Sequence, residues 1–185
     1  IMVPAWIKGP REDLGAPTDY PFVTHELMDP QNDPTVKMIK HHGLSNSPTS
    51  RVKVLFVPSY LNGDDGIFNL PYYDLLIGLD ISIFPSYYEP WGYTPHESVA
   101  FAIPTITTTL SGFGVWAGSQ NKQKETTMDN GVAVIHRDDA NYAEVVEEIA
   151  SVIHDFSLKS GEQVELLKRK ATKLSDKADW SHFIE

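Results

Sequence analysis

Five short apolar runs divide the sequence, and each is continuous rather than alternating with polar residues. Continuous runs of this length are typical of strands that are buried on both faces of a sheet. The runs occupy Ile1–Ala5, Val52–Val57, Ile81–Pro85, Ile103–Ile106 and Val132–Ile135. We therefore expect these five segments to form the strands of a mostly parallel sheet.

Helical patterns lie between most of these runs. In Ala140–Phe156 the apolar residues recur at helical spacing, while acidic residues occupy the opposite face. Shorter helices are predicted over Thr35–Leu44, Tyr72–Leu79 and Pro95–Ala102, and a last surface helix is predicted in the C-terminal tail, residues 158–185. Because strands alternate with helices, the pattern predicts an α/β fold in which right-handed crossovers place helices over a parallel sheet.

Two connections lack a clear period. Lys8–Pro34 contains five of the thirteen prolines, and Ser111–Gly131 is rich in Gly, Ser and other polar residues. Loops of this length inside a compact domain are usually functional or partly disordered. We therefore expect irregular structure in both segments.

Composition excludes several classes of function. The 185 residues carry 15 basic and 25 acidic side chains, for a net charge of −10. This balance argues against nucleic acid or an anionic membrane surface as a partner, because both need clustered Lys and Arg. The sequence has no cysteine, which excludes disulfides and Cys-based zinc sites. No apolar run is long enough to span a membrane, so a cytoplasmic protein is the expectation.

The chemistry is concentrated between Ile81 and Gly114. Here a buried strand leads into the sequence PSYYEPWGY, which contains a carboxylate, three tyrosines and a tryptophan, and a helix follows. Ligands of open α/β folds bind at the carboxyl ends of the strands, and this is where the segment is expected to lie. A glycine at position 92 would let the backbone approach such a ligand closely.

The start of that helix carries its own signal. Thr94 is a suitable N-cap, Pro95 suits the first helical position, and Glu97 then falls at the third, which together form a capping box. The free N–H groups and the positive dipole end at a helix N-terminus favour a phosphate. The sequence thus predicts an anion-binding helix start beside the carboxylate of Glu89.

The amino-acid sequence of this segment is distinctive enough to compare with known families. PSYYEPWGYTPHE followed by SGFG resembles the donor-site motif of the fungal and animal-type glycogen synthases, glycosyltransferase family 3. Further matches lie, in the same order, at residues 24–33, 46–56 and 174–180. The resemblance implies a three-layer Rossmann-like domain with a mostly parallel sheet. It would be the C-terminal, nucleotide-sugar-binding half of a two-domain (GT-B) enzyme. Residues 1–185 would then be one incomplete domain that lacks its first βα unit and ends in the helical tail.

The resemblance also implies roles for the residues of the motif. Glu89 is expected to be the catalytic residue, facing the donor glucose near the anomeric centre, and Glu97 to hold the ribose hydroxyls. The backbone of Trp91, Gly92, Tyr93 and Thr94, with the Thr94 hydroxyl, would cradle the distal phosphate.

Tyr72 would stack on the uracil of the donor. Structural roles compete with three of these functional ones. Glu97 is explained by the capping box, Tyr72 could be a core aromatic, and Trp91 could pack the loop. Glu89 has no such structural explanation between Tyr88 and Pro90.

The implied activity is retaining transfer of glucose from UDP-glucose to the non-reducing end of an α-1,4-glucan, without metal or cofactor. Catalysis would rest on stabilising the leaving diphosphate and an oxocarbenium-like sugar. The Arg and Lys that neutralise the diphosphate in this family belong upstream of residue 1, so the chain alone is expected to be inactive. The missing unit would leave an apolar edge exposed, which predicts self-association into a homo-oligomer.

Two alternatives remain open. The chain could belong to another GT-B glycosyltransferase, of the sucrose or starch synthase type, or it could be a non-catalytic nucleotide-binding or assembly module. A dinucleotide fingerprint at Gly112-Phe113-Gly114 is excluded by spacing, because the next glycine is Gly118. A flexible glycine loop near the donor sugar is the expectation for that segment.

Overall fold

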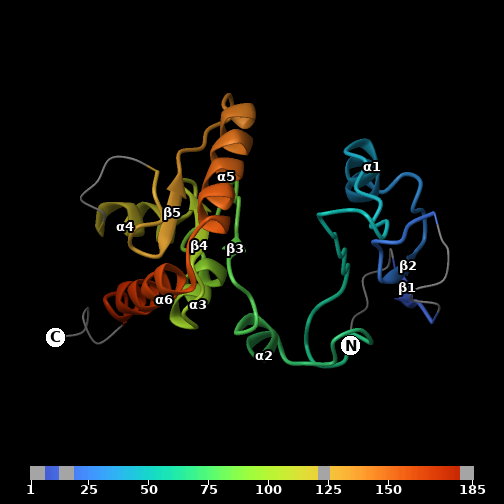
Figure 1. Ribbon diagram of the computed structural model, residues 1–185, viewed down its shortest axis with the longest axis horizontal. Coiled ribbons are helices and arrows are strands. Elements are labelled where there is room, and N and C mark those ends of the chain that lie inside the picture. The colour runs from blue at the N-terminus through green and yellow to red at the C-terminus, as the bar shows by residue number, and fades with distance from the viewer. Residues whose placement is uncertain (1–6, 13–18, 121–125, 180–185) are drawn as a thin grey trace. The chain divides into compact units, whose positions relative to one another are not determined.

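The computed structural model describes residues 7–12, 19–120 and 126–179. The chain divides into two compact units, Ile1–Tyr72 and Tyr73–Glu185 (Figure 1). The expectation of one domain over residues 1–185 stays a prediction. The apolar run Ile1–Ala5 lies outside the described residues.

The first unit pairs two short antiparallel strands, β1 (Ile7–Pro10) and β2 (His25–Leu27), and adds the helix α1 (Pro34–His41). The helix predicted over Thr35–Leu44 is confirmed in shorter form. Its N-cap is Asp33, whose carboxylate accepts a hydrogen bond from the Val36 N–H at 2.9 Å. The core of this unit consists of Phe22, Val23, Leu27, Val36 and Ile39.

The predicted strand at Val52–Val57 is wrong. The segment makes only an isolated bridge, in which Phe56 pairs with Val23. Two of its apolar residues, Val52 and Leu55, are more than half exposed, so the run is not buried on both faces. The amide of Asn46 bonds the N–H and the C=O of Val54 at 2.8 and 2.6 Å, which replaces a neighbouring strand. Lys8–Pro34, expected to be irregular, contains β2 and all of β1 except Ile7.

The second unit is built on three parallel strands in the order β3-β4-β5. They are β3 (Ser82–Ile83), β4 (Thr105–Thr108) and β5 (Val132–Ile135). The helix α2 (Tyr72–Leu76) begins at the last residue of the first unit. The other helices are α3 (Tyr93–Ala100), α4 (Gly112–Gln120), α5 (Tyr142–Ser157) and α6 (Gly161–Asp176). The predicted α/β class and parallel sheet are confirmed in this unit.

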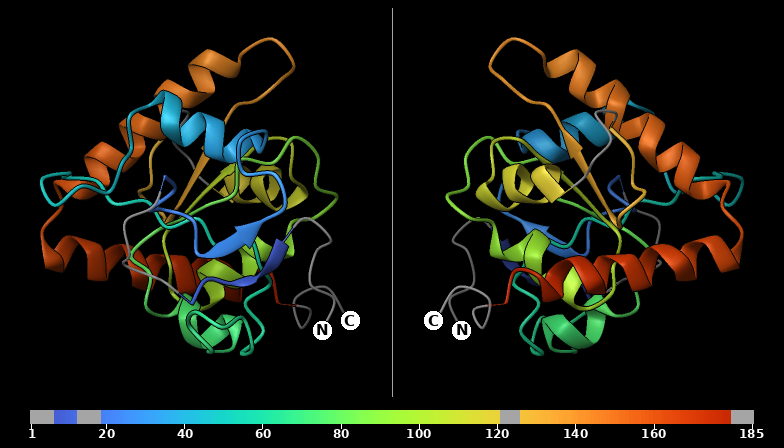
Figure 2. Two further views of the ribbon diagram at one scale, coloured as in Figure 1. Left: turned by 90° about the vertical axis from the view of Figure 1, so that its right-hand side faces the viewer. Right: turned by 90° about the vertical axis from the view of Figure 1, so that its left-hand side faces the viewer.

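Side chains of β5 alternate between two cores, which shows that the sheet is covered on both faces. Ala133 and Ile135 pack with Val145 and Val152 of α5. Val132 and Val134 belong to the core on the opposite face of the sheet. That core is completed by α3, α4 and the second half of α6, through Val99, Phe113, Ala117, Ala171 and Leu174. Figure 2 shows α5 and α6 diverging from their short connection with the sheet between them.

Several predicted boundaries shift in the structure. The tail helix, expected over residues 158–185, is α6, which begins after a capping box formed by Ser160 and Gln163. Ser111–Gly131, expected to be irregular, contains the nine-residue helix α4. Within the described residues no helix combines the length and the apolar character needed to cross a membrane.

Candidate functional site

The segment between β3 and α3, residues 85–92, is called the motif loop here. Its backbone is held by the chain that follows β4. The Glu89 N–H donates to the Leu110 carbonyl at 3.0 Å, and the Gly112 N–H donates to the Glu89 carbonyl at 3.1 Å. These bonds form a parallel bridge between Glu89 and Ser111, beyond the last β3–β4 pair. The loop therefore extends the sheet pairing at the carboxyl ends of the strands.

The Glu89 carboxylate takes no part in holding this loop in place. Its backbone is bonded on both sides, but its half-buried side chain makes no hydrogen bond or ion pair to another described residue. A carboxylate fixed in place by its backbone and left unpaired at a ligand-binding edge can act on a ligand without first breaking an internal contact.

The capping box predicted at the start of α3 is wrong. The helix begins at Tyr93, its N-cap is Gly92, and no side chain caps it. Gly92 has φ 98°, a left-handed conformation that suits glycine, and its carbonyl accepts from the His96 N–H at 3.3 Å. Thr94 and Pro95 therefore lie inside the first turn, and Glu97 falls too late to bond back to the cap.

This arrangement leaves donors at the helix start. Pro95 has no N–H and the His96 N–H is used, while the N–H groups of Tyr93 and Thr94 meet no acceptor among the described residues. Both residues are exposed. The predicted free amides at this helix N-terminus are thus present, two residues earlier than expected and without the cap.

Glu97 has a partner that the sequence did not suggest. The Tyr73 hydroxyl donates to the Glu97 carboxylate at 3.0 Å, and the Tyr73 ring stacks on Phe101 with ring centroids 5.0 Å apart. The contact orients the carboxylate outside any capping role. Tyr72, the predicted uracil-stacking residue, is half-buried and closes the first unit, so its role stays a prediction.

Trp91 lies in a cluster of aromatic rings. Its indole N–H donates to His96 Nδ1 at 3.3 Å, and its ring packs edge-on against Phe113 and tilted against Trp116. Burial lowers the pKa of His96, although the nearby Glu97 charge and a hydrogen bond to the Ser175 backbone oppose this. A neutral imidazole is what the indole donor requires, so the contact and the pKa direction agree.

The expected flexible glycine loop at 112–114 is instead the first turn of α4, packed against other backbone. A Cβ at position 112 would lie 2.2 Å from the Pro90 carbonyl oxygen, and one at 114 would lie 2.0 Å from that of Thr108. The Phe113 N–H also donates to the Trp91 carbonyl. These glycines allow α4 to dock directly on the motif loop, which is why polar and glycine-rich sequence here forms a helix.

A cavity of about 720 Å³ adjoins the loop between α3 and the end of α6. Its walls include Trp91, Tyr93 and His96 on one side and Asp176 and Asp179 on the other. In the described part of the chain, no group of three or more His, Asp or Glu side chains is placed to hold a metal ion.

Sequence reasoning missed Arg137 as well as Tyr73. Arg137 is 5% exposed, follows β5, and reaches the carbonyl of Pro85 in the motif loop. One signal was present: carboxyl ends of parallel strands meet at one edge, so a residue just after β5 is expected near the end of β3.

Comparison with known proteins shows which family this sequence matches. The family model described as glycogen synthase matches residues 16–184. The chain is 38% identical over 160 residues to glycogen [starch] synthase isoform 1 of Saccharomyces cerevisiae, covering 86% of this chain and 22% of that protein. It is 36% identical to glycogen [starch] synthase of Caenorhabditis elegans and 33% identical to the human liver form, each over 88% of this chain. Those alignments span 24% and 23% of the two relatives, so the chain covers about a quarter of their length.

Proposed function

This chain belongs to the glycogen synthase family, and from that membership we propose that it is the donor-binding part of a retaining glucosyltransferase. The proposed reaction moves glucose from UDP-glucose to the non-reducing end of an α-1,4-glucan. Because the chain spans only 22% of a relative such as the yeast isoform, the rest of the catalytic machinery would come from outside it. The observation that carries the proposal is the unpaired carboxylate of Glu89 on a loop fixed at the edge of the parallel sheet.

Glu89 is proposed to face the glucose near its anomeric centre. Both of its backbone groups are hydrogen bonded, so its Cα has little freedom, while its carboxylate stays available. A preorganised negative group beside an oxocarbenium-like sugar lowers the barrier because it needs no reorganisation as the charge develops.

The start of α3 is proposed to receive the distal phosphate. The free N–H groups of Tyr93 and Thr94 lie at the positive end of the helix dipole, and the Thr94 hydroxyl is exposed beside them. Gly92 supplies the turn that aims them. Glu97, held by Tyr73, is proposed to bind the ribose hydroxyls, and Tyr72 to stack on the uracil.

Trp91 is proposed to help hold the distal phosphate through its backbone rather than through its ring. Its carbonyl already accepts from Phe113, and its indole is committed to His96. The ring then sets the shape of the loop that carries Glu89 and Gly92 and leads into Thr94 of α3.

A chimera tests the proposal. The matching segment of the yeast isoform 1 synthase is exchanged for this chain, and glucosyl transfer from UDP-glucose to glycogen is measured. We expect the chimera to be active and Glu89→Gln to lose at least about a hundredfold in turnover, as removal of a key charged group does. Glu147→Gln, an exposed glutamate on α5, is the matched control and should retain activity.

Unchanged turnover in the Glu89→Gln chimera would contradict the catalytic role. If that variant also kept its affinity for UDP-glucose, a non-catalytic nucleotide-binding module would be the better description. Transfer that accepted ADP-glucose in preference to UDP-glucose would favour a glycosyltransferase of the starch synthase type.

A further inference from the structure

We propose that Arg137 is a positioning residue for the motif loop, fixing the backbone that presents Glu89 to the donor sugar. This inference rests on the function proposed for Glu89. The side chain is 5% exposed, and its Nη1 donates to the Pro85 carbonyl at 2.6 Å. Its guanidinium carbon lies 3.5 Å from the centroid of the Tyr87 ring. One side chain thus holds two of the first three residues of the loop.

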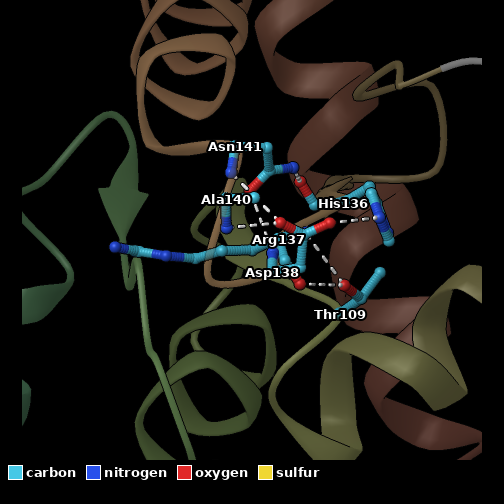
Figure 3. A network of polar contacts seen from close by, with 6 residues as sticks. All are labelled: Thr109, His136, Arg137, Asp138, Ala140 and Asn141. Carbon is cyan, nitrogen blue, oxygen red and sulfur yellow. Dashed lines mark hydrogen bonds and ion pairs between the residues drawn. The ribbon is translucent and has the colours of Figure 1, made fainter.

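The backbone of Arg137 is itself held in place. Its N–H donates to the Thr109 hydroxyl at 3.0 Å, which ties the end of β5 to the end of β4. The Asp138 carboxylate accepts from the N–H groups of Ala140 and Asn141, and the Asn141 amide bonds back to His136 and Asp138 (Figure 3). The hydrogen bonds of the turn 136–141 therefore fix the backbone from which the Arg137 side chain extends.

The burial of this guanidinium needs an explanation. No carboxylate lies within ion-pairing distance of Arg137 among the described residues, and its Nε is buried without a partner. A buried cation without a counter-ion is costly, so packing alone would favour an apolar residue here. The contacts it does make, a charge-assisted bond to a carbonyl and a stack on an aromatic ring, are both directed at the motif loop.

Tyr87 completes the arrangement from the solvent side. Tyr87 is 56% exposed, and its ring covers the guanidinium of the buried Arg137. Other loop residues are fixed by β4 and the chain just after it: the Thr108 hydroxyl donates to the Ser86 carbonyl at 2.8 Å, and the Glu89 N–H donates to the Leu110 carbonyl. Pro85, Ser86, Tyr87 and Glu89 are therefore each anchored, and Arg137 supplies two of the four anchors.

The side chain must be arginine for this task. A lysine could reach the Pro85 carbonyl with one N–H, but it lacks the planar group that stacks on Tyr87 while donating in its own plane. Methionine has a similar length and neither contact. Arg137→Lys and Arg137→Met therefore form a graded pair, and Tyr87→Phe is a matched control because a phenyl ring keeps the cation–π face.

Amide hydrogen exchange on this chain reads the positioning directly. In Arg137→Met we expect exchange at Glu89 and Gly112 to accelerate by about tenfold, as for the loss of a charge-assisted hydrogen bond. Amides of the β4–β5 ladder should keep their wild-type rates. Arg137→Lys should be intermediate, and Tyr87→Phe should match the wild type.

The active chimera supplies the functional arm. Arg137→Met should lower kcat by about tenfold with a smaller change in KM, because a misplaced Glu89 affects the transition state more than ground-state binding. Unchanged exchange at Glu89 and Gly112 would overturn the proposal. So would an equal acceleration at every amide of the second unit, or a rise in KM alone. If the unmutated chimera were inactive, the proposed function would fail, while exchange would still decide the role of Arg137.

Discussion

The two faces of the β3–β4–β5 sheet are built from different kinds of side chain. The face under α5 is mostly apolar, with Ile106, Ala133 and Ile135 at most 1% exposed against Val145 and Val152, and Thr108 adds a hydroxyl at the end of β4. The face under α3 and α4 mixes apolar residues with hydroxyls and aromatic rings. Apolar packing under α5 contributes stability but has no preferred direction. The second face, in contrast, contains groups whose hydrogen bonds and ring contacts require a fixed orientation.

Hydroxyls on the second face form an ordered chain. The Thr105 hydroxyl donates to the Ile103 carbonyl at 2.9 Å, so it must accept from Ser82, and Ser82 in turn accepts from Ser98 of α3. Nearby, the Ser111 hydroxyl accepts from the Gly114 N–H at 2.9 Å. These bonds fix how α3 and α4 sit on the sheet, and with them the two ends of the motif loop.

Truncation on the apolar face should have the largest effect on stability. Ile135→Ala removes three buried carbons from a fully buried site, and we expect a loss of about 3–4 kcal/mol in the free energy of unfolding. Urea unfolding at neutral pH measures it. Val146→Ala on the exposed side of α5 should change stability by less than about 0.5 kcal/mol.

The same variant tests whether the faces are separable. Below the unfolding transition, exchange at the Glu89 and Gly112 amides of Ile135→Ala should follow the global loss and no more. Faster local opening of the motif loop in this variant would show that the apolar face also positions the site, and the distinction between the faces would fail.

A methyl group on the second face should cost somewhat less stability but act on the loop itself. Gly114→Ala places a Cβ 2.0 Å from the Thr108 carbonyl, and we expect a loss of about 2–3 kcal/mol, as in an overpacked core. Gly118→Ala is the matched control in the same helix, because its Cβ would meet nothing closer than 4.0 Å. Its better helix propensity should make that variant neutral or slightly more stable.

Exchange again separates the two glycine variants. Gly114→Ala should lift α4 from the motif loop and expose the Phe113 and Gly112 amides, and Gly118→Ala should leave both protected. Equal protection in the two variants would mean that α4 can shift without disturbing the loop.

The apolar face is also the part that sequence predicts best. The α5 helix was predicted over Ala140–Phe156 and found at Tyr142–Ser157, and β5 was predicted without error. Both rest on apolar periodicity, which follows directly from burial against one surface. The second face lacks such a period: α4 consists of GFGVWAGSQ, whose helix depends on backbone contact with Thr108 and Pro90. Tertiary packing of this kind leaves no local signal.

The candidate site divides in the same way. Glu89 could be selected from the sequence because no local structural role explained it, and its unpaired side chain agrees with that reasoning. The N-cap of α3 could not be predicted from the sequence, because Thr-Pro-x-Glu fits the pattern of a capping box. Only the left-handed conformation of Gly92 shows that the helix begins earlier. Arg137 and Tyr73 act across 52 and 24 residues of sequence, on Pro85 and Glu97 respectively, and no pattern within one element connects them.

Removing a hydroxyl from the ordered chain should have a moderate effect. Ser98→Ala removes the donor to the buried Ser82, and we expect a loss of about 1–2 kcal/mol in the free energy of unfolding. The double variant Ser82→Ala with Ser98→Ala should cost less than the sum of the single variants, because both ends of one bond are then gone. A double-mutant cycle by urea unfolding measures the coupling; strict additivity would contradict the assigned bond.

Lowering the pH should produce the smallest loss in the free energy of unfolding. The structural change that accompanies it should be confined to the second face. Burial holds the pKa of His96 below the 6.5 of an unperturbed histidine, so the unfolded chain binds a proton more readily than the folded one. The stability that this contributes is complete above pH 6.5 and falls as the pH drops from there toward the lower folded pKa. His96→Asn, which keeps an acceptor for the Trp91 indole, should remove this dependence.

Titration followed by the Trp91 indole N–H resonance locates the event, because protonating His96 Nδ1 removes the acceptor of that bond. The midpoint of the shift should lie below pH 6.5, while the backbone amide resonances of β5 stay constant. A shift centred above pH 6.5 would contradict this prediction, because it would mean that the folded state favours the imidazolium. The carboxylates of Glu97, Asp176 and Asp179 would then outweigh the effect of burial on the pKa of His96.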